Sequence, residues 1–305
     1  MNHDNDPASG RRRSGAASSY QGRYINLDRS RKRLDSIKQH LASLGVSDRY
    51  RRFPAVDGTK LMRKSQLTPG EVGIFASHLS VLDWASRQSS VTHVIEDDAV
   101  LSALLPSAVS FFEAGGLFDK VHVALTEMMI PPNLQALQGL KAQFDAATAS
   151  AESTKILSML DLIDLEAVNF SCMSSYLVSP RSARHVLPLC RREWDAGPTQ
   201  PFDFFLRREA RRRRIKAVCI FPFITSIDIA SAGKSTSGRR KRDNDSELIM
   251  DLLRYSFFID HDLQGTARTI LADIVARADG GSRDPHREFL SVLLGLVTSS
   301  RFESF

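Results

Sequence analysis

The sequence has few cysteines and lacks long apolar runs. Its three cysteines, Cys172, Cys190 and Cys219, are odd in number and are not spaced as C-x-x-C pairs. They therefore predict neither a disulfide framework nor a zinc site. No apolar run approaches the roughly 20 residues of a membrane-spanning helix. The N-terminal segment has charges but no apolar stretch after them, so we expect no secretory signal. These absences predict a cytoplasmic protein.

The composition is that of a globular protein with an excess of positive charge. Of the 305 residues, 42% are hydrophobic and 25% charged, as in ordinary globular proteins. This length is enough for one large domain or two smaller ones. The net charge of +6 comes largely from arginine-rich runs at 11–13, 207–214 and 239–242. Such runs can meet nucleic acid or anionic lipid. The runs contain no aromatic residues for base stacking, which disfavours single-stranded nucleic acid, and a solvated helix face is the simpler interpretation.

Changes in composition divide the chain into four predicted parts. Residues 1–19, rich in Gly, Ser and Arg, predict a disordered basic tail. Residues 20–230 alternate apolar runs with amphipathic stretches and form the predicted main domain. Residues 231–246 predict a flexible linker. Residues 247–305 repeat apolar residues at helical spacing, which predicts a helical extension.

The main domain alternates predicted strands and helices, which indicates an α/β fold with a mostly parallel sheet flanked by helices. Strands are expected near 22–27, 50–57, 91–95, 120–125, 169–178 and 215–222, and residues 131–168 are expected to be helical or partly mobile. Thr68, Pro69 and Glu71 predict a capping box that opens a helix over 72–87. His78 lies in the middle of that helix, where a packed histidine is a better interpretation than a ligand.

Three consecutive acids follow the apolar run that ends at Ile95. Because burying an unpaired carboxylate is costly, Glu96, Asp97 and Asp98 are expected at the carboxyl end of the strand, where open α/β sheets bind ligands. Alternation would point Glu96 and Asp98 to one side and Asp97 to the other. Two carboxylates on one side would suit a divalent cation carrying a diphosphate. A solvated acidic loop explains these three residues equally well.

Five sequence blocks stand in a fixed order along the main domain. They are Y-I-N-L-D-R (24–29), F-P-A-V-D-G (53–58), L-T-P-G-E-V-G-I-F-A-S-H (67–78), V-I-E-D-D-A-V-L (94–101) and S-Y-L-V-S-P-R-S-A (175–183). Together they resemble glycosyltransferase family 25, which includes bacterial lipopolysaccharide and lipooligosaccharide β-galactosyltransferases and the collagen galactosyltransferases. The likeness covers residues 23–225 and departs from the family pattern at Arg23, Ile74 and Ser182. Residues 128–168 show little of the pattern, which leaves the choice of acceptor open.

The resemblance implies a Rossmann-type, GT-A-like fold and an inverting, metal-dependent transferase. It implies that Asp98, with Glu96 as the second ligand, holds Mn²⁺ or another divalent cation on the diphosphate of a UDP-sugar. The cation would neutralise charge on the departing nucleotide. The residues that would contact the nucleotide are Asn26, Asp28, Arg29, Arg33 and Asp97.

Inversion in a single displacement requires a base that removes the proton of the acceptor hydroxyl. Asp203 stands where the family tends to carry an acid and is our candidate. It could also be a helix N-cap, since Pro201 and Phe202 precede it. Glu71 ranks lower because the capping box already gives it a role.

The resemblance predicts transfer of a hexose, galactose first, to a surface glycan of lipopolysaccharide type or to a lipid-linked acceptor. A non-catalytic binding module with the same fold and a nucleic-acid-binding protein remain as alternatives. The basic runs suit peripheral contact with the anionic inner membrane, where a lipid-linked acceptor lies.

The blocks at 24–29 and 94–101 also predict how the site is assembled. If each block ends a strand of the same parallel sheet, their side chains should meet at one edge. The residues expected to line one cleft are Asn26, Asp28, Arg29, Glu96 and Asp98. The helix of His78 is expected behind that cleft, and Asp203 is expected to approach it from the acceptor side.

Overall fold

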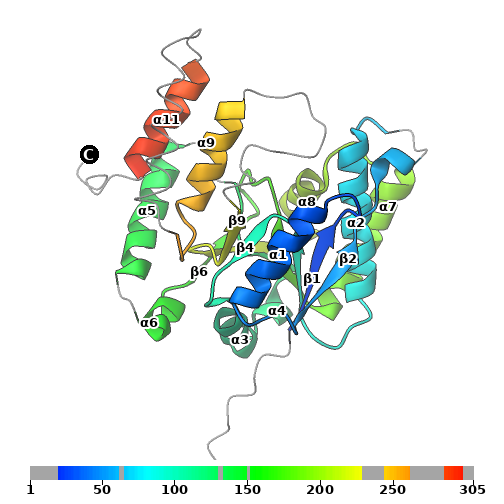
Figure 1. Cartoon of the computed structure of the whole chain (residues 1–305), viewed down its shortest axis with the longest axis horizontal. Coiled ribbons are helices and arrows are strands. Elements are labelled where there is room, and N and C mark those ends of the chain that lie inside the picture. The colour runs from blue at the N-terminus through cyan, green and yellow to red at the C-terminus, as the bar shows by residue number, and fades with distance from the viewer. Residues whose placement is uncertain are drawn as a thin grey trace, which may run out of the picture.

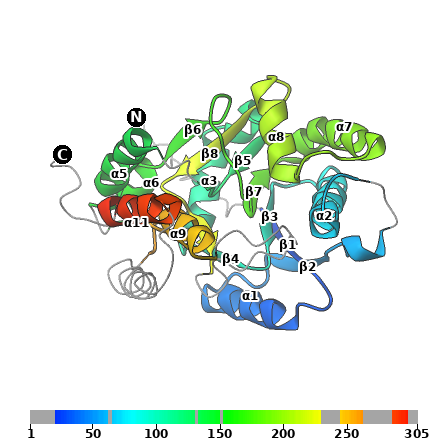
Figure 2. The same cartoon turned by 90° about the horizontal axis from the view of Figure 1, so that it is seen from above.

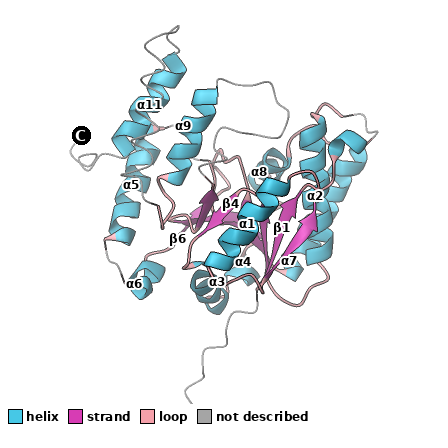
Figure 3. Cartoon of the chain, in the orientation of Figure 1, coloured by secondary structure: helices cyan, strands magenta, loops and turns pink. Residues whose placement is uncertain are grey.

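The computed structural model describes residues 20–61, 65–129, 133–149, 152–228, 244–261 and 285–297. Within these residues the chain forms an α/β structure with a central sheet surrounded by helices (Figure 1, Figure 3). The predicted fold class is therefore confirmed. The predicted tail at 1–19, much of the predicted linker and the run at 239–242 lie outside the described residues.

The central sheet has seven strands in the part of the chain that the structure describes, in the order β2-β1-β3-β7-β5-β8-β6. The strands are β1 (Gln21–Asn26), β2 (Tyr50–Pro54), β3 (Thr92–Glu96), β5 (Val123–Leu125), β6 (Asp161–Asp164), β7 (Ser175–Val178) and β8 (Ala217–Phe221). β1 is parallel to β2 and β3, β5 is parallel to β8, and β7 runs antiparallel between β3 and β5. The carboxyl ends of β1, β3 and β5 therefore meet at the same edge of the sheet.

A second, two-stranded sheet begins directly beyond the acidic residues. It pairs β4 (Ala99–Leu101) with β9 (Thr225–Ile227) in antiparallel fashion. Just past these strands, the Asp228 amide donates to the Asp98 carbonyl at 2.6 Å. The small sheet thus fixes the backbone on the far side of the acidic turn.

Helices cover both faces of the sheet. They are α1 (Arg31–Ser43), α2 (Pro69–Ala85), α3 (Leu105–Ala114), α4 (Leu117–Lys120), α5 (Leu134–Thr148), α6 (Ser153–Ser158), α7 (Pro180–Ala196), α8 (Phe202–Arg211), α9 (Asn244–Tyr255) and α11 (Pro285–Val297), with a 3₁₀ turn at Gly58–Lys60. Successive strand residues enter different buried clusters: Val94 and Tyr176 pack in the cluster that contains Phe75 of α2, whereas Ile95 and Leu177 pack with α1. This is the period-two alternation of a sheet that is buried on both faces.

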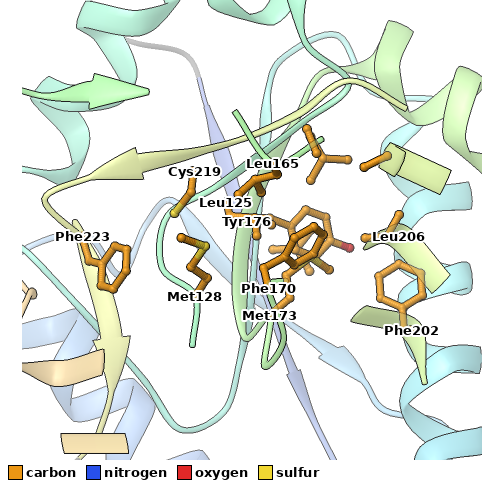
Figure 4. Close-up of a cluster of buried hydrophobic side chains, with 14 of the residues drawn as sticks. Leu125, Met128, Leu165, Phe170, Met173, Tyr176, Phe202, Leu206, Cys219 and Phe223 are labelled. Atoms are coloured by element: carbon orange, nitrogen blue, oxygen red, sulfur yellow. The ribbon is translucent and has the colours of Figure 1, made fainter. Parts of the chain in front are cut away.

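The larger cluster extends from α2 and α8 to the C-terminal helices. Tyr176 and Phe170 lie near its middle, Phe202 lies toward one side with Leu206, and Met128 and Phe223 lie toward the other (Figure 4). Leu252 of α9 and Leu293 of α11 belong to the same cluster. α11 packs on α9 and α5, opposite the flank formed by α2 and α7 (Figure 2). α9 begins at Asn244, inside the range predicted as linker, and the C-terminal helices share the core of the main domain.

Polar side chains form a buried row across the sheet. Tyr50 Oη lies 2.7 Å from His93 Nδ1, and His93 Nε2 lies 2.8 Å from Ser175 Oγ. The Thr126 hydroxyl donates to Ser175 Oγ at 2.6 Å and lies 2.8 Å from Thr225 Oγ1. Gly22 of β1 makes room for this row, since a Cβ atom there would lie 2.1 Å from the Tyr50 ring.

Two predicted segments differ from the structure. Residues 161–164 form the edge strand β6, although 131–168 was expected to be helical or mobile; four residues are too few to show a clear period. Of the strand predicted at 169–178, only Ser175–Val178 form a strand, β7. Among the described helices, none is long and apolar enough to cross a membrane.

Candidate active site

The acidic turn lies beside the end of β1. Ile25 is the register partner of Glu96, so the blocks 24–29 and 94–98 leave the sheet next to each other. β3 ends at Glu96, and Asp97 and Asp98 form a turn before β4. The expected alternation does not continue past the strand, because β3 ends at Glu96. Glu96 and Asp97 line the same cavity, whereas Glu96 and Asp98 were expected to share one side.

Asp97 is held by two side chains. Asn26 Nδ2 donates to Asp97 Oδ2 at 2.7 Å, and Arg33 Nη1 donates to Asp97 Oδ1 at 3.0 Å. Asn26 is 1% exposed and also accepts a hydrogen bond from Arg52 Nε at 3.0 Å. Burial raises the pKa of Asp97, and the Asn26 hydrogen bond and the Arg33 charge oppose that rise. Asn26 and Asp97 therefore form a rigid frame at the strand ends.

Asp98 has one oxygen in an ion pair and one without a partner. Its Oδ2 lies 3.0 Å from Arg33 Nη1, whereas its buried Oδ1 has no hydrogen-bond partner among the described residues. Burial, reinforced by the charge of Glu96, raises the pKa of Asp98 to about 7. Both effects penalise the anion, so Asp98 is a group that an added cation would stabilise.

Asp98 and Glu96 offer the carboxylate oxygens that a hard divalent cation prefers, and they lie on two adjoining hollows. The Glu96 carboxylate is partly exposed and lies 3.6 Å from His78 Nε2. Within the described ranges, no group of three His, Cys, Asp or Glu side chains could hold a metal ion by itself. Mg²⁺ in nucleotide enzymes is commonly held by one or two carboxylates together with substrate phosphates, so two carboxylates are sufficient for that kind of site.

A cavity of about 310 Å³ opens beside the acidic turn. Its size is at the lower end of the range of small-molecule sites. Arg29, Arg33, His78, Glu96 and Asp97 line it, together with the loop after β2 and the start of α2. The cavity thus brings two arginines together with three carboxylates, since Asp57 also lines it.

The wall formed by α2 depends on its N-terminal cap and on a close packing contact. Thr68 Oγ1 accepts from the Glu71 amide, and the Glu71 carboxylate accepts from the Thr68 amide. This is the predicted capping box. Gly73 lies so near the preceding loop that a Cβ atom there would stand 2.6 Å from the Val56 carbonyl oxygen.

The structure divides the predicted cleft into two adjoining hollows. Asp98 lies on a second hollow of about 330 Å³, which Asp97, His40 and Asp228 also line. Asn26 lies beneath the surface, and the side chain of Asp28 is 83% exposed and paired with Arg52. Of the five residues expected in one cleft, only Arg29 and Glu96 line the first cavity. Arg29 is itself paired with Asp57.

His78 lines the cavity rather than lying behind it. It is 2% exposed, stacks on Phe202 with 4.5 Å between ring centroids, and lies 3.2 Å from the Tyr176 hydroxyl. Asp203 is the second residue of α8 and lines neither hollow. Its two oxygens accept from the amides of Cys172 and Phe204, each at 2.9 Å.

Two charged residues near the site were missed in the sequence. Glu127 follows β5 and is fully buried, and Arg254 of α9 lies 3.1 Å from it. The run V-H-V-A-L-T-E repeats the apolar-then-acid pattern of β3 and could have indicated Glu127. Arg254 gives no signal, because it is a single arginine in an amphipathic helix outside the family likeness.

The arginine run at 207–214 is largely paired within the protein. Arg208 binds Glu193 and Glu209, and Arg214 also binds Glu209. A further ion pair joins Arg213 to Glu166. These carboxylates offset much of the positive charge that the sequence shows in this run.

Comparison with known families identifies the family to which the chain is similar. The family model described as glycosyltransferase family 25 (LPS biosynthesis protein) matches residues 23–206. The matched segment contains β1 from Arg23 onward, β2, β3, the acidic turn and all of the residues that line the first cavity. No match to the curated proteins was found.

Proposed function

The chain belongs to glycosyltransferase family 25, and on that premise we propose that it is an inverting hexosyltransferase that uses a UDP-sugar. Galactose is the proposed sugar, and a surface glycan of lipopolysaccharide type is the proposed acceptor. The observation that carries the proposal is the placement of the acidic turn at the carboxyl end of β3, beside a cavity lined by Arg29 and Arg33. Arginine side chains and cation-binding carboxylates are both groups that commonly bind a diphosphate.

In this proposal the donor occupies the 310 Å³ cavity, with its diphosphate directed toward the adjoining hollow that Asp98 lines. Asp98 and Glu96 would hold Mn²⁺ or another divalent cation, which when bound neutralises charge on the departing UDP. Arg29, which lines this cavity, would meet a phosphate oxygen. Arg33 holds Asp97 and Asp98 in place through its two ion pairs. The buried Asn26 fixes Asp97 from below.

Asp203 remains our proposed base for the acceptor hydroxyl. The Cys172 and Phe204 amides fix the orientation of its carboxylate. Asp203 lines neither hollow, so a role as base requires that it exchange these amide contacts for the acceptor hydroxyl when substrate binds. Comparing Asp203→Asn with Asp203→Glu for turnover and for donor KM would separate a base from a residue that only caps α8.

The central test is release of UDP from a panel of UDP-sugars with and without Mn²⁺. We expect turnover with UDP-galactose, dependence on added metal, and a loss of at least about 100-fold in Asp98→Asn, since metal stabilisation of a leaving group is worth several kcal/mol. Asp35→Asn is the matched control, because Asp35 is exposed on α1. Unchanged turnover in Asp98→Asn would remove the metal assignment. Failure of the wild type to bind UDP by calorimetry would favour the non-catalytic module.

We further propose that the reaction takes place at the cytoplasmic face of the inner membrane. Because ion pairs offset much of the charge at 207–214, we expect only salt-sensitive association with anionic vesicles. Flotation with anionic and neutral liposomes measures this. Equal binding to both kinds of liposome would count against the charge-based contact.

A further inference from the structure

Arg254 is a buried cation that α9 brings to the carboxyl end of the sheet. It is 3% exposed, and Leu252 and Leu253 beside it are buried in the core. A buried guanidinium is costly unless acceptors surround it. Its Nη1 lies 3.1 Å from Glu127 Oε2, and its Nη2 lies 3.4 Å from Asp251 Oδ1. Burial works against the charge, but Glu127 and Asp251 keep the pKa of Arg254 above its ordinary value.

The contacts of this ion pair converge on the turn at 172–174, which precedes β7. Arg254 Nη1 donates to the Cys172 carbonyl at 3.1 Å. Glu127 Oε1 accepts from the Ser174 amide at 2.9 Å and from the Ser174 hydroxyl at 2.7 Å. Cys172 has a φ of 54°, in the left-handed region that disfavours a residue with a side chain. The turn therefore depends on the groups that bind it.

This turn is bonded to two residues of the proposed machinery. The Glu96 amide donates to the Ser174 carbonyl at 2.8 Å, and the Cys172 amide donates to Asp203 at 2.9 Å. The proposed metal ligand and the proposed base thus attach to the same three-residue segment. Arg254 binds the same segment at the Cys172 carbonyl, and it lies beyond residue 206, where the family match ends.

We propose that Arg254 is a positioning residue for sugar transfer, which acts through the turn at 172–174 to fix Glu96 and Asp203 relative to each other. The C-terminal helix α9 is then part of the support of the active site. The catalytic part of this inference rests on the proposed function. Small displacements of reacting groups reduce turnover strongly, so the effect belongs in kcat rather than in donor binding.

The experiment compares the full-length variants Arg254→Met, Arg254→Lys and the double variant Glu127→Gln with Arg254→Met. Arg254→Met should melt well below the wild type, because Glu127 is left buried without its counter-charge, and the double variant should recover much of that loss. We expect the double variant to keep kcat reduced by about 10- to 100-fold, with donor KM within about threefold of the wild type. Arg254→Lys should recover part of kcat. The double variant overturns the inference if it regains both the melting temperature and the kcat of the wild type.

Arg213→Met is the matched control, because Arg213 is an exposed arginine paired with Glu166. Amide hydrogen exchange of the same proteins gives a readout that needs no activity. In the double variant, exchange should become faster in peptides that contain Cys172, Ser174 and Glu96, and it should stay unchanged in Arg213→Met. If the wild type transfers no hexose, the proposed function fails by itself. Unchanged exchange at 172–174 would overturn the role of Arg254.

Discussion

At the scale of single residues, the polar side chains at the ends of β1 and β3 bind one another through hydrogen bonds and ion pairs. Arg33 bridges Asp97 and Asp98, and Asn26 takes the remaining oxygen of Asp97. Carboxylates this close together would repel one another without a shared cation. Because Arg33 pairs with the other oxygen of Asp98, Asp98 Oδ1 has no hydrogen-bond partner among the described residues. It is therefore the atom most suited to bind an added cation.

His93 predicts how stability depends on pH. Complete burial lowers the pKa of His93 to about 3, from an ordinary value of 6.5. Between these values the unfolded chain binds a proton that the folded protein does not. Stability from this residue is therefore complete above pH 6.5 and is lost as the pH falls toward 3, at up to about 1.4 kcal/mol per pH unit.

Urea denaturation at pH 7.5, 6.5 and 5.5 checks this, with His93→Gln as the comparison. The wild type should lose about 1 kcal/mol more than the variant between pH 6.5 and 5.5. Glutamine can still donate to and accept from the neighbours of His93 but does not titrate in this range. Equal pH slopes for the two proteins would show that His93 is not the group responsible.

At the scale of secondary structure, α2 links the fold to the cavity. Its capping box fixes where the helix begins, and its first turns form one wall of the cavity. The helix can approach the loop after β2 because residue 73 has no side chain. A local packing requirement therefore sets the width of the proposed donor site.

Gly73→Ala is expected to destabilise the protein although alanine is the better helix former. The new Cβ atom would lie 2.6 Å from the Val56 carbonyl, and overpacking of this kind costs roughly 1–3 kcal/mol. Gly139→Ala in α5 is the matched control, since nothing lies within 4 Å of a Cβ atom there. That change should stabilise by roughly 0.5–1 kcal/mol. Thermal denaturation of both variants measures these changes in stability. Equal changes for Gly73→Ala and Gly139→Ala would refute the packing argument.

How far the sequence predicts these elements depends on the kind of signal each one carries. The capping box at Thr68 and the apolar run before Glu96 have local, physically determined patterns, and both appear as predicted. The strand β6 has four residues and no such pattern. The orientation of Asp98 depends on a turn after the strand, and the approach of Arg254 depends on tertiary packing. Neither is encoded by residue spacing.

At the scale of the whole molecule, the core does not end where the family match ends. The match stops at residue 206, yet α9 and α11 contribute Leu252, Leu253 and Leu293 to the cluster that contains Phe75 of α2. In the part of the chain that the structure describes, the C-terminal helices therefore complete the main domain. The proposed catalytic region and these helices should unfold together.

Leu252→Ala tests this cooperation. The side chain is fully buried, so its truncation should cost about 2–5 kcal/mol. Val292→Ala is the control, because Val292 on α11 is 59% exposed and should change stability by less than about 0.5 kcal/mol. Unfolding is followed both by circular dichroism and by loss of UDP binding. Separate transitions for the two signals in the wild type would contradict a single cooperative unit.

The buried row from Thr225 to Tyr50 has a direction. Each hydroxyl supplies only one hydrogen, and that of Thr126 is given to Ser175. Thr126 must then accept from Thr225, and the hydrogen of Ser175 remains available for His93 Nε2. When Ser175 gives its hydrogen to His93 Nε2, the imidazole carries its own proton on Nδ1, facing Tyr50. Because reversing one hydroxyl would require reversing the others, the row acts as a single aligned chain of dipoles across the sheet.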